Sequence, residues 1–304
     1  MRILLIVGGW SSEREVSLRG GRGMEAALRA RGHEVTWFDL LENFDRLSEE
    51  AARHDFALIN LHGAPGEDGL VQALLERAGC PYQGSGPAGS FLALNKSAAK
   101  QVFRRAGLDT PAWEFLPVRP AAGWAPSLPY PIFVKSNTGG SSLRLSRAEN
   151  RAQLDSILDE IFSAGDAALM ETAISGREVT CGVLGEEALP PILIEPVAGE
   201  FFDYTSKYAS GGARELCPAP LPPELTARVQ ALALRAHRAL GLSGYSRADF
   251  ILTPEDRLWL LEVNTLPGMT ETSLVPQEAA VIGLDFGALL ERLMELGMKA
   301  HPRA

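Results

Sequence analysis

The stretches SRADFIL (246–252) and LWLLEVNTLPGMT (258–270) decide the fold of the C-terminal part of this chain. Both begin as apolar runs of strand length, and the TPEDR segment between them predicts a hairpin. Residues two apart on a strand point to the same face, so Asp249 should lie beside Glu262 and Asn264. A buried cluster of polar oxygens needs a cation or a set of hydrogen-bond donors.

Two interpretations of this cluster follow from its residue types. Oxygen ligands without His or Cys suit Mg²⁺ or Mn²⁺, usually completed by ligand phosphates and water. Alternatively, Arg247 pairs with the carboxylates and neutralises their buried charge. One arginine does not balance two carboxylates, so we favour the metal site, although the residue types alone leave the arginine pairing open.

The rest of the chain alternates strand-like and helix-like segments. RILLIV (2–7) is a continuous apolar run that ends at Gly8-Gly9, which is typical of a buried parallel strand. Further strands are expected at 33–40, 55–61, 113–118, 131–135, 167–171, 177–184, 190–197, 246–252 and 257–263. Helices are expected through Met24 and Leu28 to about Gly32, and at 70–77, 95–106, 147–163 and 222–240. This order predicts an α/β layered domain followed by a larger α+β region.

Composition bounds the class of protein. The chain has 304 residues, 46% of them hydrophobic, which suffices for two or three compact domains. A formal net charge of -9 disfavours a nucleic-acid partner, because phosphate-binding surfaces gather Lys and Arg. Three cysteines without metal-like spacing indicate buried thiols in a reducing compartment.

Targeting and membrane signals are not expected in this sequence. MRILLIVGG lacks the small-residue cleavage site of a signal peptide and is better explained as a first strand. No run approaches the roughly 18 apolar residues of a membrane span. We therefore expect a soluble, cytoplasmic protein with no membrane partner.

Two glycine-containing segments leave predicted parallel strands at the sheet edge where ligands usually bind. They are GGWSSEREVSL (8–18) and NLHGAPGEDG (60–69). The first is not GxGxxG, so a dinucleotide site is poorly supported. Glu15 lies near a helix N-terminus, where a carboxylate is favoured, and His62 ends a strand. The structural alternatives are a helix-capping cluster and a hydrogen-bonded core histidine.

Two further loops are candidates for ligand contacts. In VKSNTGGSSLRLS (134–146), Lys135 ends a strand, and glycine N–H groups can hold phosphate oxygens. The Walker pattern is absent, and Lys96 could supply a second positive charge. FFDYTSKYASGG (201–212) places aromatic residues and a lysine ahead of glycines. A surface hairpin and a solvated loop are the structural alternatives.

Six segments occur in series: SSEREVSL, NLHGAPGEDG, VK…GGSS, DYTSKY, SRADF and LLEVNTLPGMT. From Gly8 to Pro276 they resemble the D-alanine–D-alanine ligases, members of the ATP-grasp superfamily. The resemblance implies an ATP-grasp fold that combines α/β and α+β parts. An N-terminal Rossmann-like open-sheet domain would span 1–88, a central small α+β domain 89–172, and a C-terminal α+β domain with the metal site 173–304.

The resemblance also assigns residues to the nucleotide. Lys96 and Lys135 would contact the ATP phosphates, and Lys207 would reach the transferred phosphoryl group. The other assignments are Glu171 and Ile174 at the adenine, Glu178 at the ribose, and Asp249, Glu262 and Asn264 at two Mg²⁺ or Mn²⁺ ions.

The substrate side follows in the same way. Glu15 would bind the ammonium group of the first D-alanine, with His62 nearby, and Ser141 and Tyr208 would orient that site. The remaining assignments are Ser273 and the Leu274 backbone at the carboxylate of the second D-alanine, and Arg247 with the Gly268 backbone N–H at the oxyanion.

A carboxylate and an amine do not condense readily in water, so the resemblance implies that ATP first forms an acyl phosphate. The product would be D-alanyl-D-alanine for peptidoglycan precursor synthesis, and the enzyme would be a homodimer. Segments 136–142 and 203–212 would close over the site. Two departures from the family pattern are Ser136, where proline is common, and Leu143-Arg144, where Val-Gly is frequent.

Two alternatives have to be weighed against this hypothesis. One is a related ligase that takes D-lactate or D-serine as its second substrate, against which Tyr208 in the SKY context argues. The other is a nucleotide-binding protein that has lost catalysis. Intact Arg247 argues against it, because a binding protein has little need of an oxyanion donor.

Overall fold

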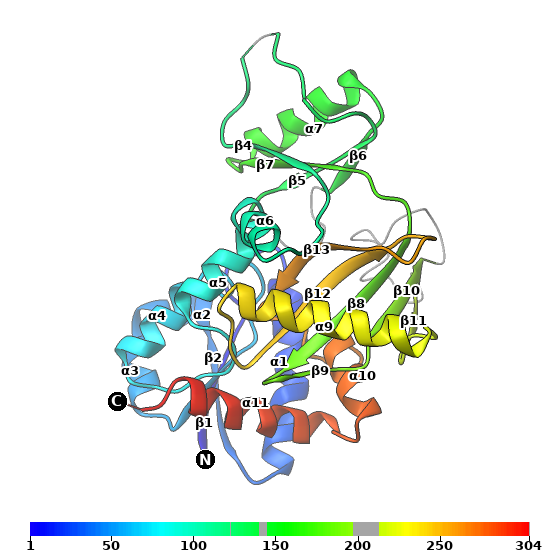
Figure 1. Ribbon diagram of the computed structural model, residues 1–304. Coiled ribbons are helices and arrows are strands. Elements are labelled where there is room, and N and C mark those ends of the chain that lie inside the picture. Colours follow the sequence, from blue (N-terminus) through cyan, green and yellow to red (C-terminus); the bar gives the residue numbers. More distant parts are fainter. Residues whose placement is uncertain (122, 140–144, 197–212, 304) are drawn as a thin grey trace.

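The computed structural model describes residues 1–121, 123–139, 145–196 and 213–303. Within these ranges the strands form three separate sheets. Figure 1 shows the N-terminal sheet at the bottom, the sheet of residues 113–172 at the top, and the C-terminal sheet between them, crossed by helix α9 (Pro223–Ala239).

The N-terminal sheet is parallel, with the strand order β2-β1-β3. Its strands are β1 (Arg2–Val7), β2 (Glu34–Asp39) and β3 (Phe56–Ile59). Helix α1 (Arg14–Ala30) packs closely on β1, since a Cβ at Gly21 would lie 2.5 Å from a methyl carbon of Val7. Other helices of this part are α2 (Leu40–Asn43), η1 (Phe44–Arg46), α3 (Leu47–Ala52) and α4 (Leu70–Arg77). The predicted parallel sheet is confirmed.

The second sheet is antiparallel, with the order β4-β7-β5-β6. Its elements are β4 (Trp113–Leu116), β5 (Ile132–Ser136), β6 (Ser146–Ala148) and β7 (Ala168–Thr172), covered by helix α7 (Arg151–Ser163). The prediction that this helix begins at residue 147 is wrong. Residues 146–148 pair with β5, and Asn150 caps the helix by accepting from the Gln153 N–H.

The third sheet has the order β11-β10-β8-β12-β13, with the short strand β9 also on β8. Its strands are β8 (Arg177–Leu184), β9 (Glu187–Ala188), β10 (Ile192–Pro196), β11 (Ala213–Leu216), β12 (Tyr245–Leu252) and β13 (Leu258–Asn264). Strands β12 and β13 are antiparallel neighbours. The hairpin predicted from SRADFIL and LWLLEVN is therefore confirmed.

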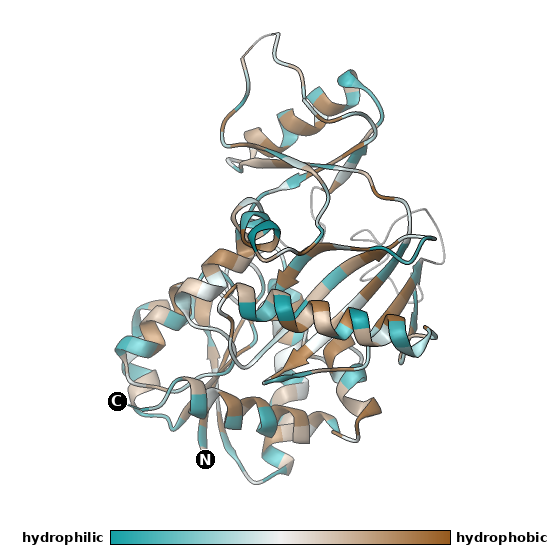
Figure 2. Cartoon of the chain, viewed as in Figure 1, coloured by the Kyte–Doolittle hydropathy of each residue, from teal (hydrophilic) through white to brown (hydrophobic). Residues whose placement is uncertain are grey.

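Helices α5 (Pro87–Leu94) and α6 (Lys96–Arg105) lie between the first and second sheets in the chain, and α10 (Leu274–Val281) and α11 (Phe286–Ala300) follow the last strand. Buried residues of α10 and α11 belong to the core of the N-terminal sheet, and Phe103 of α6 to the core of the third sheet. Figure 2 shows apolar residues concentrated on the strands and inner helix faces. Because these cores cross residues 88 and 172, the division into 1–88, 89–172 and 173–304 stays a prediction.

Two expectations from composition can be compared with the structure. Cys80 and Cys181 are buried free thiols, and Cys217 is only partly buried. Burial raises the pKa of Cys80 and of Cys217 to about 11. No helix in the described ranges is long and apolar enough to cross a bilayer.

Candidate functional site

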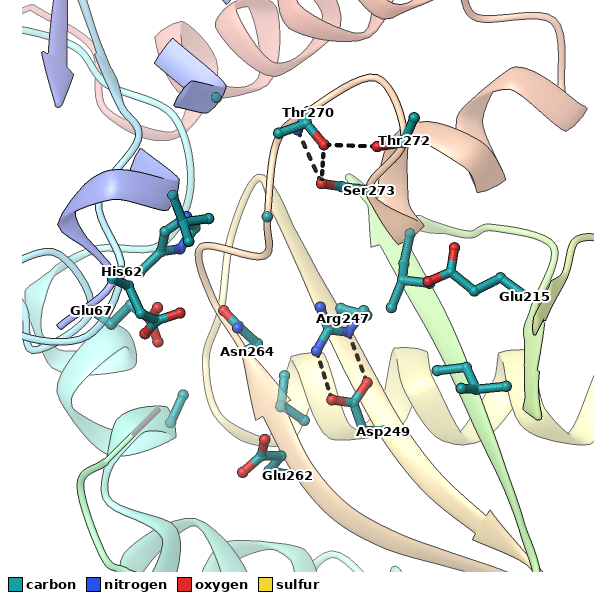
Figure 3. A pocket seen from close by; sticks show the side chains of 18 of the residues that line it. His62, Glu67, Glu215, Arg247, Asp249, Glu262, Asn264, Thr270, Thr272 and Ser273 are labelled. Carbon is teal, nitrogen blue, oxygen red and sulfur yellow. Dashed lines mark hydrogen bonds and ion pairs between the residues drawn. The ribbon is translucent and has the colours of Figure 1, made fainter. Parts of the chain in front are cut away.

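A cavity of about 660 Å³ lies between the N-terminal and third sheets. Figure 3 shows its walls: His62 and Glu67 on one side, the β12–β13 hairpin in the middle, and the loop of Thr270 and Ser273 opposite. The edge that follows the parallel strands and the face of the hairpin thus meet in one space. Both were predicted to carry ligand-binding residues.

The hairpin brings the predicted acidic and amide side chains together. Asp249 is the register partner of Glu262, and Arg247 that of Asn264. All four line the cavity. The register shifts directly after Asp249, and such bulges are frequent beside active sites, where they redirect side chains.

Arg247 nevertheless holds Asp249 firmly. Its Nε and one terminal nitrogen each donate to a different Asp249 oxygen at 2.8 Å, and the Thr180 hydroxyl donates to Oδ1 at 2.7 Å. Burial alone would lower the pKa of Arg247, but Asp249 outweighs it and raises that pKa, so the guanidinium stays charged. The arginine pairing that the sequence left open is therefore present for Asp249.

The donor set still fits a divalent cation. A carboxylate accepts about four hydrogen bonds, so Oδ2 of Asp249 keeps capacity beyond its bond to Arg247. The Glu262 side chain is 32% exposed and lies 3.6 Å from the Lys96 ammonium. Asn264 accepts from the Leu266 N–H at 2.8 Å, which leaves its amide oxygen a second lone pair. Two carboxylates and an amide match the preference of Mg²⁺ for oxygen. Within the described residues, no group of three His, Cys, Asp or Glu side chains is arranged to hold a metal.

The two lysines predicted at the phosphates occupy different surroundings. Lys96 lines the cavity and donates to the Gly139 carbonyl, at the loop that follows β5. Lys135 lies 2.6 Å from Glu171, which also pairs with the buried Lys100. Burial alone would raise the pKa of Glu171, but the two ammonium groups together keep it below its usual value. Lys135 and Glu171 are not among the described residues that line this cavity.

Glu15 is not placed in the cavity, and this prediction needs correction. It is exposed in the first turn of α1, where the helix dipole favours a carboxylate. Glu13, at the N-cap position, is 6% exposed and lines the cavity together with His62. The helix turns about 100° per residue, so two residues separate an inward side chain from an outward one. The carboxylate that lines the cavity is that of Glu13.

His62 and Glu67 form a buried polar wall beside Glu13. Burial lowers the pKa of His62, although Glu13 opposes this. Burial, reinforced by Glu13, raises the pKa of Glu67 to about 7, and Glu67 accepts from the Gly63 N–H at 3.1 Å. Glu67 lies within the segment 60–69 that the sequence singled out, but its spacing gave no reason to prefer it to Asp68.

The loop before α10 forms the opposite wall. Gly268, Ser273 and Leu274 all line the cavity; their predicted roles at the second substrate and the oxyanion stay predictions. The Ser273 hydroxyl lies 2.7 Å from the Thr270 hydroxyl and 3.1 Å from the Thr270 nitrogen. Ser273 is also the N-cap of α10 without a side-chain capping bond. The first N–H groups of the helix are therefore available at the cavity.

The remaining predicted residues divide into three groups. Glu178, predicted at the ribose, lines the cavity. Ile174, predicted at the adenine, is partly buried and is not among the lining residues. Ser141, Lys207 and Tyr208 lie outside the described residues. The same holds for residues 140–142 of the predicted closing segment 136–142 and for the whole of the predicted closing segment 203–212.

Comparison with known proteins places this site in a family. The family model described as "D-ala D-ala ligase C-terminus" matches residues 102–295. A D-alanine–D-alanine ligase of Desulfovibrio desulfuricans is 73% identical over 298 residues, covering 98% of this chain and 97% of that protein. The chain belongs to the D-alanine–D-alanine ligase family. A second member, from Nitratidesulfovibrio vulgaris, is 67% identical over 303 residues and covers 100% of both chains.

A solved structure of the family confirms the fold. The crystal structure of a D-alanine–D-alanine ligase from Bacillus anthracis, complexed with ATP, matches with a TM-score of 0.88 at 35% identity. The match covers 99% of this chain and 98% of that one. The predicted ATP-grasp fold and the predicted membership of this ligase family are both confirmed.

Proposed function

We propose that this chain joins two D-alanine molecules to D-alanyl-D-alanine while ATP is cleaved to ADP and phosphate. The observation that carries the proposal is the convergence of Glu13, the β12–β13 hairpin and the N-terminus of α10 on one cavity. They provide an ammonium-binding carboxylate, groups suited to phosphate and its metal ions, and a carboxylate-binding helix end.

The first step is the transfer of the ATP γ-phosphoryl group to the carboxylate of the first D-alanine. Such transfer depends on positioning and charge neutralisation more than on covalent help from the protein. Lys96 would contact the phosphates. Lys135 would also contact them if nucleotide binding drew its ammonium group away from Glu171. Two divalent cations bound by Asp249, Glu262 and Asn264 would supply further charge neutralisation.

The second step is attack by the amine of the second D-alanine on the acyl phosphate. Arg247 keeps a terminal nitrogen that no bond to Asp249 occupies, and this nitrogen with the Gly268 N–H would stabilise the oxyanion. Ser273 and the Leu274 N–H would hold the carboxylate of the attacking amino acid. Water has to be excluded, because it would hydrolyse the acyl phosphate.

The other parts of the hypothesis extend the resemblance. Ser141 and Tyr208 would orient the first substrate with Glu13, and Lys207 would reach the phosphoryl group. Glu171, Ile174 and Glu178 would surround the nucleoside. We further infer that the chain acts in the cytoplasm, where ATP is supplied, and as a homodimer. The dipeptide would enter peptidoglycan precursor synthesis.

Substrate-dependent phosphate release tests the proposed function. Purified protein with ATP and Mg²⁺ should release phosphate when D-alanine is added, and a dipeptide should appear in equal amount. D-lactate or D-serine offered with D-alanine should form at least about tenfold less mixed product, because D-lactate lacks the attacking amine and D-serine adds a hydroxyl group to the side chain that the site has to accept. The absence of D-alanine-dependent phosphate release would overturn the proposed function, and ATP binding without any phosphate release would leave the chain as a nucleotide-binding protein. Preferred use of D-lactate or D-serine would support the related ligase.

A further inference from the structure

Glu278 is a buried carboxyl group that the proposed reaction does not use. It lies on α10, is 0% exposed, and has both oxygens 3.0 Å from the backbone nitrogen of Gly182 on β8. A buried carboxyl group is costly unless it is hydrogen-bonded. The bond to Gly182 therefore fixes α10 against the third sheet, beside which it lies in Figure 1.

Gly182 is shaped to receive this carboxyl group. A Cβ there would lie 2.3 Å from Glu278 Oε2, so a larger residue would displace the side chain. On β8, Thr180 pairs with β10 and Val183 with β9. Gly182 lies between these pairings, and at this junction its N–H donates to Glu278 instead of to a strand.

The contact joins two walls of the cavity. Gly182 is the register partner of Arg247 on β12. Leu274 precedes Glu278 by four residues, and this spacing places both on one side of α10. Arg247, Ser273 and Leu274 line the cavity, and Figure 3 shows Arg247 and Ser273 on facing elements. The Glu278–Gly182 hydrogen bond therefore connects α10, whose N-terminus would bind the carboxylate, to β8, the strand that pairs with Arg247 on β12.

We propose that Glu278 is a positioning residue for the second substrate: it sets the distance between the first turn of α10 and Arg247. This inference rests on the proposed function, because it concerns the D-alanine whose carboxylate α10 would bind. The part of Glu278 that matters is an oxygen that accepts the Gly182 N–H. Correct placement of α10 lets the amine of the bound D-alanine reach the acyl phosphate.

The charge of Glu278 is dispensable in this role. Burial raises its pKa to about 8, although the Gly182 N–H and Arg247 oppose this. A glutamine has the same shape and keeps an oxygen that can accept the Gly182 N–H. Glu278→Gln should keep the position of α10, whereas Glu278→Ala should lose it.

Steady-state kinetics at pH 7 with three variants test the proposal. Glu278→Ala should raise the KM for the second D-alanine about tenfold while the KM for ATP changes less than about twofold. Glu278→Gln should stay within about twofold of the wild type in both. The double variant Gly182→Ala/Glu278→Ala places a methyl group where a Glu278 oxygen lay and so fills part of the vacated space. It restores no hydrogen bond, so its KM for the second D-alanine should remain raised.

A merely structural role gives a different pattern. It predicts a lower Tm for Glu278→Ala with both KM values unchanged or rising together, and a return of normal kinetics in the double variant; either result overturns the proposal. If Glu278→Ala does not fold, the double and glutamine variants decide. Glu255→Ala, in the exposed β12–β13 turn, is the matched control. Without D-alanine-dependent phosphate release from wild type and control, the proposed function itself fails.

Discussion

Glu13→Gln should lower kcat/KM for the first D-alanine about 100-fold, whereas Glu15→Gln should leave it within about twofold. A 100-fold loss corresponds to about 2.7 kcal/mol, within the range for a hydrogen bond to a charged group. Glu13 is buried at the cavity and Glu15 is exposed on α1. The measurement is initial-rate kinetics at saturating ATP, with D-alanine varied through both binding steps.

The pair of variants forms an internal control. Each variant removes one negative charge, and the two positions are only two residues apart in the sequence, so nonspecific electrostatic effects on the activity should be similar. A large loss of activity in Glu15→Gln with normal activity in Glu13→Gln would show that Glu15 binds the ammonium group, as the sequence motif predicted, and would contradict the role of Glu13.

Glu262→Gln should reduce kcat about 1,000-fold or more, because a neutral amide is a poor ligand for Mg²⁺ and a metal contributes several kcal/mol to charge stabilisation. The remaining activity should require more Mg²⁺ for half-saturation. The fold should persist, since the Glu262 side chain is 32% exposed and its Lys96 contact is 3.6 Å long. Activity over a Mg²⁺ series and a thermal unfolding curve provide the two measurements.

Glu255→Gln is the matched variant for this experiment, because it lies in the exposed turn of the same hairpin. It should keep wild-type kcat and the same Mg²⁺ requirement. Full activity of Glu262→Gln at the wild-type Mg²⁺ concentration would remove the metal from the account. The Arg247–Asp249 pair would then be an ion pair and no more.

The β12–β13 hairpin was predictable because its two apolar runs and the TPEDR turn between them are neighbours in the sequence. Side chains alternate between the two faces of a strand, so Arg247 and Asp249 share one face of β12. Their register partners on β13, Asn264 and Glu262, lie on the same face of the sheet. The apolar run at residues 2–7 likewise predicted a buried parallel strand, and the structure places it between two parallel neighbours. The register shift directly after Asp249 did not follow from these patterns.

Other features depended on information that no local pattern carries. SSERE contains two glutamates, and only the position at which α1 begins separates the buried Glu13 from the exposed Glu15. Lys135 was expected at phosphate, but its partner Glu171 is 36 residues away by the residue numbers. Helix α11 is amphipathic and periodicity could have revealed it. Nothing in the sequence near Glu278 points to Gly182.

The path of a carboxylate oxygen tests the central claim most directly. D-Alanine labelled with ¹⁸O in its carboxylate should be incubated with ATP, Mg²⁺ and the enzyme, and the released phosphate analysed by mass spectrometry. An acyl phosphate transfers one labelled oxygen to phosphate for each dipeptide formed, because the amine displaces the phosphate together with that oxygen. Unlabelled phosphate accompanying labelled dipeptide would contradict the account.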